Sequence, residues 1–196
     1  MTVAPGITRL DWKGQLKAFL PLFGHRNWIV VADSGYPAQS RPGIETIVSG
    51  AGQIEVARRV LDAIAASKYV RANIYLDQEL QFVAEADAPG VSRYRAQLSG
   101  LLKTAKQAAL PHEQIIAKLD QTAQIFRVLI IKSELTIPYT SIFFELDCGY
   151  WGAEAEQRLR QAMAASATKQ SAYSRSVMLP DSIRLLRSTQ ERKASS

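Results

Sequence analysis

The sequence predicts an α/β domain of three layers, in which a mixed sheet is flanked by helices, followed by a basic C-terminal extension. Short apolar runs rich in β-branched residues alternate with amphipathic helical segments along residues 8–150, which is the pattern of such a domain. After residue 150 the chain becomes polar and rich in Ala, Glu and Arg. We therefore divide it into a domain at 8–150 and a helical or partly disordered extension at 151–196.

Strands are expected where short apolar runs are bounded by turn residues. Residues 28–32 (WIVVA) are apolar throughout and are followed by Asp33-Ser34-Gly35, which is typical of a fully buried strand. The other runs that resemble strands are 44–48, 69–76, 127–132 and 139–146.

Helices are expected where apolar residues recur at spacings of three and four. These segments are 9–23, 53–67, 94–109, 113–126 and 153–168. Pro21 is expected to end the first of them early, and Pro111 to stop the third and open the fourth. Asp77 is positioned to cap the segment that follows it.

Composition excludes several classes of protein. With 47% hydrophobic and 21% charged residues, the chain is neither disordered throughout nor fibrous. No apolar stretch is long enough to span a bilayer and the N-terminus carries no secretory signal, so we expect a cytoplasmic protein with no membrane partner. A single cysteine, Cys148, rules out an internal disulfide and a cysteine-based zinc site. We expect no metal.

Most of the net charge of +6 lies in the extension, where residues 151–196 hold eight basic and four acidic side chains. A basic tail is able to bind nucleic acid or acidic partners. A solvated extension or an oligomer contact explains the same charge. We favour that explanation and do not expect nucleic acid to be the partner.

The two histidines lie at junctions between expected elements. His25 precedes the buried strand, and His112 opens a helix. Either histidine could simply cap backbone groups. Asp33 follows the buried strand, at the edge where ligands collect in open α/β sheets. His25 and Asp33 can share one site only if the chain folds back between them.

Three motifs resemble those of the D-ribose pyranase/L-fucose mutarotase family. Residues 24–37 (GHRNWIVVADSGYP) are similar to its N-terminal signature, roughly G-H-x-D-x-[IL]-V-[VIL]-x-D-[AS]-x-[FLY]-P. Residues 110–114 (LPHEQ) and 134–143 (ELTIPYTSIF) resemble its helix-opening histidine segment and its last strand, in the family's order. The resemblance covers about residues 8–146.

Carried over by position, the resemblance implies a sugar site. Its residues would be His25, Asp33 and His112 as catalytic groups and Tyr139 and Ser141 as substrate-binding groups. We expect His25 to be the principal acid/base, with Asp33 orienting it or contacting a sugar hydroxyl. The chain departs from the family at Ser141, where asparagine is usual, and at Asn27, where an acid is usual. A hydroxyl cannot supply the paired donor and acceptor of an amide, so the sugar can differ from the family's.

These residue types suit the opening of a sugar hemiacetal. A base removes the anomeric proton while an acid protonates the ring oxygen, and imidazole serves in either role near neutral pH. The reaction needs no cofactor. The resemblance therefore implies a cofactor-free monosaccharide mutarotase or pyranase-like isomerase. The alternative is a non-catalytic monosaccharide-binding or sensing protein on the same fold.

The resemblance also implies a homo-oligomer, because relatives form rings, commonly decamers, whose sites lie between subunits. The aromatic-rich end of the domain agrees, since Phe143, Phe144, Tyr150 and Trp151 are more apolar surface than a small monomer usually exposes.

Overall fold

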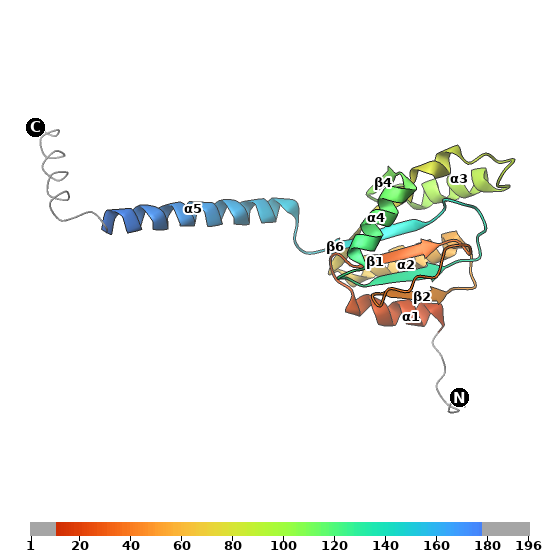
Figure 1. Ribbon diagram of the computed structural model, residues 1–196, viewed down its shortest axis with the longest axis horizontal. Helices are drawn as coiled ribbons and strands as arrows, with labels where there is room; N and C mark the ends of the chain where they lie inside the picture. Colours follow the sequence, from red (N-terminus) through yellow and green to blue (C-terminus); the bar gives the residue numbers. More distant parts are fainter. Residues whose placement is uncertain (1–10, 178–196) are drawn as a thin grey trace, which may run out of the picture. The chain divides into compact units, whose positions relative to one another are not determined.

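A six-stranded sheet forms the centre of the first unit in the computed structural model, which describes the backbone of residues 11–177 and the side chains of residues 11–168 (Figure 1). The strand order is β2-β5-β1-β6-β3-β4. The strands are β1 Trp28–Ala32, β2 Ile44–Val48, β3 Val70–Asp77, β4 Gln107–Leu110, β5 Val128–Lys132 and β6 Ile142–Cys148. β6 runs antiparallel to β1 and β3 while the other pairs are parallel, which confirms a mixed sheet.

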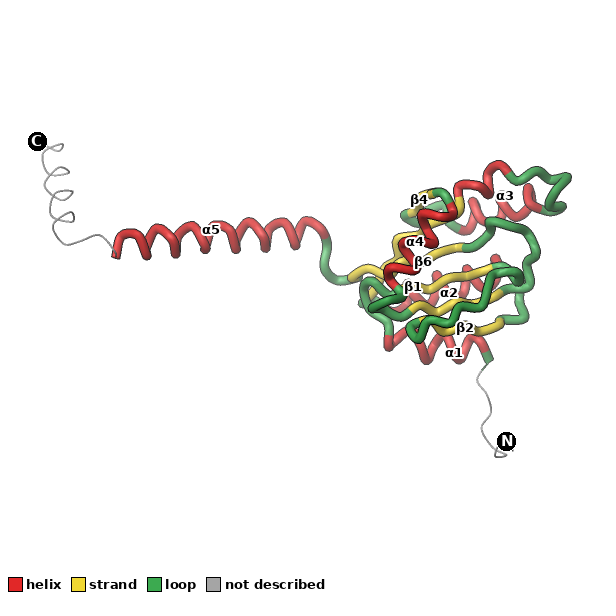
Figure 2. The backbone as a smooth tube through the Cα atoms, in the orientation of Figure 1, coloured by secondary structure: helices red, strands yellow, loops and turns green. Residues whose placement is uncertain are grey.

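Helices cover both faces of this sheet. They are α1 Trp12–Phe19, α2 Gln53–Ser67, α3 Val91–Leu101 and α4 His112–Thr122, with short 3-10 helices η1 Leu20–Leu22 and η2 Gln78–Phe82. Buried side chains of α1, α2 and α3 join the larger hydrophobic cluster, whereas those of α4 join a smaller one. In Figure 2, α4 crosses one face of the sheet and α2 lies behind the strands. The three-layer arrangement expected from the sequence is confirmed.

The central strand shows why the sheet is buried on both sides. Every residue of β1 is buried. Ile29 and Val31 belong to the cluster under α1 to α3, and Trp28 and Val30 to the cluster under α4. Because successive side chains of a strand point to opposite faces, an unbroken apolar run is what a strand between two helical layers requires.

Two expectations about local structure are wrong. The segment 94–109 does not form one helix, because α3 ends at Leu101 and Gln107–Leu110 pairs with β3 as β4. Asp77 does not cap η2 with its side chain; it is the last residue of β3, and its carboxyl group bonds His112 instead. As expected, the first helix stops before Pro21, which lies in η1.

Contacts within the chain divide it after Tyr150 into two compact units. The second unit contains helix α5, Ala153–Val177, which is longer than the expected 153–168. Glu156 accepts hydrogen bonds there from Trp151 and from Arg160, at 2.8 and 2.7 Å. Within residues 11–177, no helix has the length and apolar character needed to cross a membrane.

Candidate functional site

Strand direction brings most of the expected site residues to one edge of the sheet. β1 and β3 both run antiparallel to β6, so their C-terminal ends meet the N-terminal end of β6. Asp33 follows β1 and Tyr139 lies just before β6. The register, continued by one residue, sets Ser141 between Ala32 and Asp77. We call this edge, with Asp33, Asp77, His112, Tyr139 and Ser141, the C-terminal edge.

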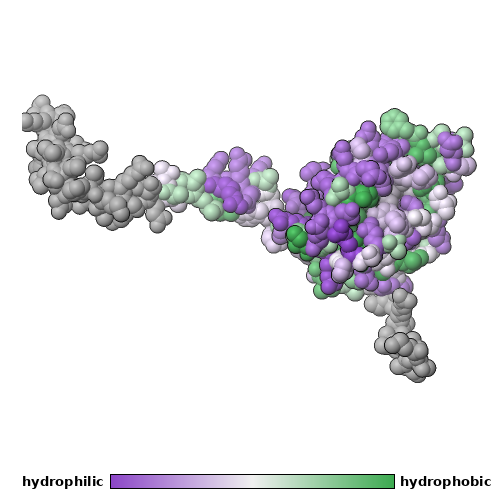
Figure 3. Space-filling view, viewed as in Figure 1, coloured by the Kyte–Doolittle hydropathy of each residue, from purple (hydrophilic) through white to green (hydrophobic). Residues whose placement is uncertain are grey.

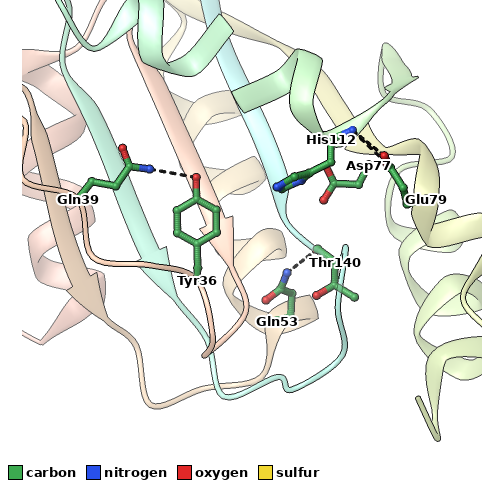
Figure 4. A network of polar contacts seen from close by, with 7 residues as sticks. All are labelled: Tyr36, Gln39, Gln53, Asp77, Glu79, His112 and Thr140. Atoms are coloured by element: carbon green, nitrogen blue, oxygen red, sulfur yellow. Dashed lines mark hydrogen bonds and ion pairs between the residues drawn. The ribbon is translucent and has the colours of Figure 1, made fainter. Parts of the chain in front are cut away.

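His112 is held by a carboxyl group that the sequence did not assign to the site. Its Nδ1 lies 3.0 Å from Oδ1 of Asp77, whose side chain is only 1% exposed (Figure 4). Burial raises the pKa of Asp77, and this outweighs the hydrogen bond from His112, which lowers it. The second carboxyl oxygen, Oδ2, is buried without a hydrogen-bond partner.

A second carboxylate fixes the backbone of the same histidine. Both oxygens of Glu79 lie 3.0 Å from the backbone N–H of His112, the first residue of α4. Pro111, the residue before the helix, makes no side-chain capping bond. A negative charge at a helix N-terminus stabilises the unpaired N–H groups there, so Glu79 acts as the cap from a distant element.

Tyr139 lies beside the His112 ring in a strained conformation. The two ring centroids are 5.7 Å apart, with the planes nearly perpendicular. Tyr139 has a φ of +57°, the left-handed region that costs a non-glycine residue about 1 kcal/mol or more. Its side chain is nevertheless 42% exposed, so the strain presents the tyrosine at the surface.

Buried polar groups hold the loop that carries Tyr139. The Gln53 amide donates hydrogen bonds to the carbonyl oxygens of Thr140 and Val31 and accepts one from Ser133. The Tyr94 hydroxyl donates to the same Thr140 carbonyl at 2.8 Å. This support keeps the backbone around Tyr139 in one conformation.

Tyr36 adds a neutral hydroxyl at this edge. Figure 4 draws it across from His112 and Asp77. Burial, assisted by the charges of Asp77 and Asp120, raises its pKa to about 12. Its oxygen accepts a hydrogen bond from Gln39 at 3.3 Å, so its proton is free to be donated.

Asp33 lies at the C-terminal edge, in a turn that its own side chain stabilises. Its Oδ1 accepts a hydrogen bond from the backbone N–H of Gly35 at 2.8 Å. The carboxyl group is half-buried and close enough to raise the pKa of Asp77 and of Tyr36 through its charge. Asp33 therefore belongs to the same electrostatic group as Asp77.

His25 lies at the opposite edge of the sheet. It precedes β1, in a turn where the Arg26 N–H donates to the carbonyl of Leu146 at 2.7 Å. β1 alone spans about 16 Å at the usual rise for each strand residue, and His25 and Asp33 lie beyond its two ends. Within one chain, His25 meets neither Asp33 nor His112.

Asp77 and Glu79 are not among the site residues that the sequence predicts. Their signal is the run Asp-Gln-Glu directly after an apolar strand, at the edge where the site forms. A cavity of about 610 Å³ lies between α1 and α2, and no histidine lines it. In the part of the chain that the structure describes, no three His, Cys, Asp or Glu side chains converge to hold a metal ion.

The chain is similar to one known protein family and to several solved structures. The sequence model of the RbsD / FucU transport protein family matches residues 13–148. No curated protein gives a match. Among solved structures, Bacillus subtilis RbsD complexed with D-ribose is 19% identical, with 77% of this chain and 100% of that chain covered and a TM-score of 0.49. Fucose mutarotase from Streptococcus pneumoniae in complex with L-fucose is 20% identical, covering 71% and 96%, with a TM-score of 0.45. FucU from Bifidobacterium longum is 17% identical, covering 67% and 92%, with a TM-score of 0.47.

Proposed function

The chain belongs to the RbsD/FucU family, and from this premise we propose that it is a cofactor-free isomerase that exchanges anomeric or ring forms of a free monosaccharide. The observation that carries the proposal is the partly exposed His112 ring at the C-terminal edge, 5.7 Å from the Tyr139 ring. An imidazole beside a phenol offers proton-transfer and hydrogen-bonding groups at one point of the surface.

The chemistry proceeds through the open-chain sugar. A base removes the proton of the anomeric hydroxyl, and the electron pair of that oxygen forms the carbonyl as the bond from the anomeric carbon to the ring oxygen breaks. An acid protonates the departing ring oxygen. Closure on the other face of the carbonyl gives the other anomer, and closure by a different hydroxyl gives the other ring size.

The roles follow from the properties of each group. His112 transfers a proton through its ring, and the hydroxyls of Tyr139 and Ser141 bind the sugar. Asp33 accepts a hydrogen bond from a sugar hydroxyl. Tyr36, whose pKa is about 12, stays protonated near neutral pH and serves as a donor.

A second copy of the chain supplies the second proton-transfer group, His25. Within one chain His25 lies at the far edge of the sheet, so it reaches a sugar beside His112 only from another subunit. Contrary to the expectation from the sequence, Phe143 and Phe144 are fully buried in the core of one chain and expose no surface to a partner. Other apolar side chains that are exposed support the assembly, since Leu22 is 69% exposed and Ile125 is 81% exposed. Leu22 lies three residues before His25, and Ile125 lies three residues before β5, the strand that pairs with β1. On the face seen in Figure 3, by contrast, apolar side chains are scattered among hydrophilic ones. We expect a head-to-tail ring, because one edge of each copy meets the opposite edge of the next.

Exchange NMR tests the proposed activity. A panel of equilibrated free aldoses, including D-ribose and L-fucose, is examined by saturation transfer between anomer and ring-form signals, with and without the full chain. Catalysis of at least one sugar is expected to give transfer that the sugar alone lacks. His112→Ala is expected to lower the rate at least a hundredfold, the usual contribution of an acid–base group.

The control for this experiment is Lys103→Ala, a substitution in the exposed turn after α3. It is expected to leave the exchange rate unchanged. A sugar whose signals shift on binding without faster exchange would identify a non-catalytic binding protein. Full activity in His112→Ala would remove His112 from the mechanism.

A further inference from the structure

Asp77 and His112 form a pair whose geometry suits one task. The carboxyl group ends β3, the imidazole opens α4, and only their Nδ1–Oδ1 contact of 3.0 Å joins the two side chains. Asp77 is almost fully enclosed, while the His112 side chain remains 29% exposed. Because the buried carboxyl group of Asp77 accepts a hydrogen bond from Nδ1, Nε2 is the ring nitrogen that remains available to a ligand at the surface.

We propose that Asp77 is a positioning residue, which holds His112 as its Nδ1–H tautomer so that Nε2 exchanges the proton with the sugar. This inference rests on the proposed function for its role, but not for its geometry. A carboxylate that accepts from one imidazole nitrogen orients the ring, fixes the tautomer and stabilises the imidazolium that forms during proton transfer.

Two other elements strengthen the same pair. Glu79 anchors the backbone of His112 at the start of α4, so the ring can rotate only about its own side-chain bonds. Asp33, from the end of β1, acts on Asp77 through its charge. The titratable groups around the pair include Asp33, Glu79 and the hydroxyls of Tyr36, Tyr94 and Tyr139.

The arrangement of Asp77 argues against a purely structural role. Its Oδ2 is buried without a partner, and such an atom carries a desolvation penalty that a well-packed neutral residue avoids. Burial raises the pKa of Asp77, so the folded state loses stability as pH rises from the ordinary value of 3.8 through the raised one. Asp77→Asn is therefore expected to fold at neutral pH at least as stably as the natural chain, yet to work more slowly.

Nitrogen NMR of the imidazoles reads the tautomer directly. The full chain has only two histidines, so His25→Gln identifies the signals of His112. In the natural chain, neutral His112 is expected to carry its proton on Nδ1. In Asp77→Asn, whose amide can either donate or accept, the population is expected to move toward the Nε2–H form.

Exchange kinetics supply the second readout. Asp77→Asn is expected to lower kcat by about 10- to 100-fold with little change in KM, because a ring that is no longer held in one orientation and tautomer transfers the proton less often. Glu113→Gln is the matched control, since it removes an exposed negative charge one residue from His112. It is expected to change neither the tautomer nor the rate.

The outcomes separate this inference from the proposed function. An Nε2–H tautomer in the natural chain, or an unchanged tautomer or rate in Asp77→Asn, would overturn the inference. The tautomer of His112 in the natural chain is measured without any variant at position 77. That measurement therefore tests the inference even if Asp77→Asn fails to fold. Absence of sugar exchange by the natural chain would instead overturn the proposed function, while the Nδ1–H tautomer would still be observed.

Discussion

At the scale of single residues, the C-terminal edge concentrates features that cost stability. Tyr139 has a left-handed backbone, with a φ of +57°. Asp77 buries a carboxyl oxygen without a partner. Strain of this kind persists only where the surrounding structure enforces it, and it gathers at functional sites. The groups that enforce it are therefore as testable as the groups that react.

Substitution of Gln53 measures how much its buried hydrogen bonds stabilise the backbone around Tyr139. Gln53→Leu keeps roughly the same volume but leaves Ser133 and the Thr140 carbonyl without one of their partners. Buried unsatisfied groups cost about 1–3 kcal/mol each, so we expect the free energy of unfolding to fall by about 2–4 kcal/mol. Urea denaturation monitored by circular dichroism measures it.

The matched control is Gln97→Leu, which alters an exposed glutamine of α3. It is expected to change the unfolding free energy by less than about 0.5 kcal/mol. Equal losses in the two variants would show that the Gln53 hydrogen bonds contribute nothing specific.

The sequence indicated part of this site, and the reason for its limit is physical. Asp33 and His112 could be named because the motifs that contain them resemble those of the RbsD/FucU family, and their places at a strand end and a helix start agree with that resemblance. Asp77 could not, because its partner is 35 positions away and meets it only through the order of strands in the sheet. The strand expected between His25 and Asp33 already indicated that these two residues could meet only if the chain folded back, and the structure shows that it does not.

At the scale of elements, five of the six strands could be predicted from the sequence, and the edge strand β4 could not. β1 and β5 are apolar runs buried by helices on both faces, so their amino-acid composition predicts their burial. β4 reads Gln-Ala-Ala-Leu, which has no strand preference, and most of it is exposed. It is a strand because β3 offers it a free edge to pair with, and helix propensity yields to that pairing.

The start of α3 offers a pH-dependent test of capping. Glu85 accepts hydrogen bonds from the backbone N–H groups of Gly90 and Ser92, at 2.5 and 2.9 Å. These bonds lower the pKa of Glu85 to about 2. The carboxylate therefore adds stability that is fully present above its ordinary pKa of 4.5 and is lost as pH falls toward 2.

We expect Glu85→Gln to be less stable than the natural chain at neutral pH and equally stable near pH 2. Thermal unfolding across that range measures the difference. Asp87→Asn, which removes an exposed acid from the same loop, is the control and is expected to give a difference that does not vary in this way. A Glu85→Gln deficit independent of pH would show that the carboxylate charge is irrelevant.

At the scale of the whole molecule, the hydrophobic core lies entirely in the first unit. The buried hydrophobic residues of the described chain run from Trp12 to Leu146. We therefore propose that the domain folds without residues 151–196. A chain ending at Tyr150 is expected to keep its unfolding free energy within about 0.5 kcal/mol. Loss of cooperative urea unfolding in the shortened chain would show that the extension is part of the fold.

The proposed chemistry depends on the assembly, because it requires His25 from one copy and His112 from another. His25→Ala and His112→Ala are each expected to be inactive alone. When equal amounts are unfolded together and refolded, a site is intact only if its His25 comes from a His112→Ala chain and its His112 from a His25→Ala chain. Random assembly makes about one site in four intact, so about a quarter of the natural exchange rate is expected to return.

Light scattering on the same samples reports whether they assemble beyond the 21.7 kDa of one chain. Mixing that restores no activity in assemblies of natural size would mean that the two histidines do not act across a subunit boundary, and the proposed proton transfer by His25 would fall with it.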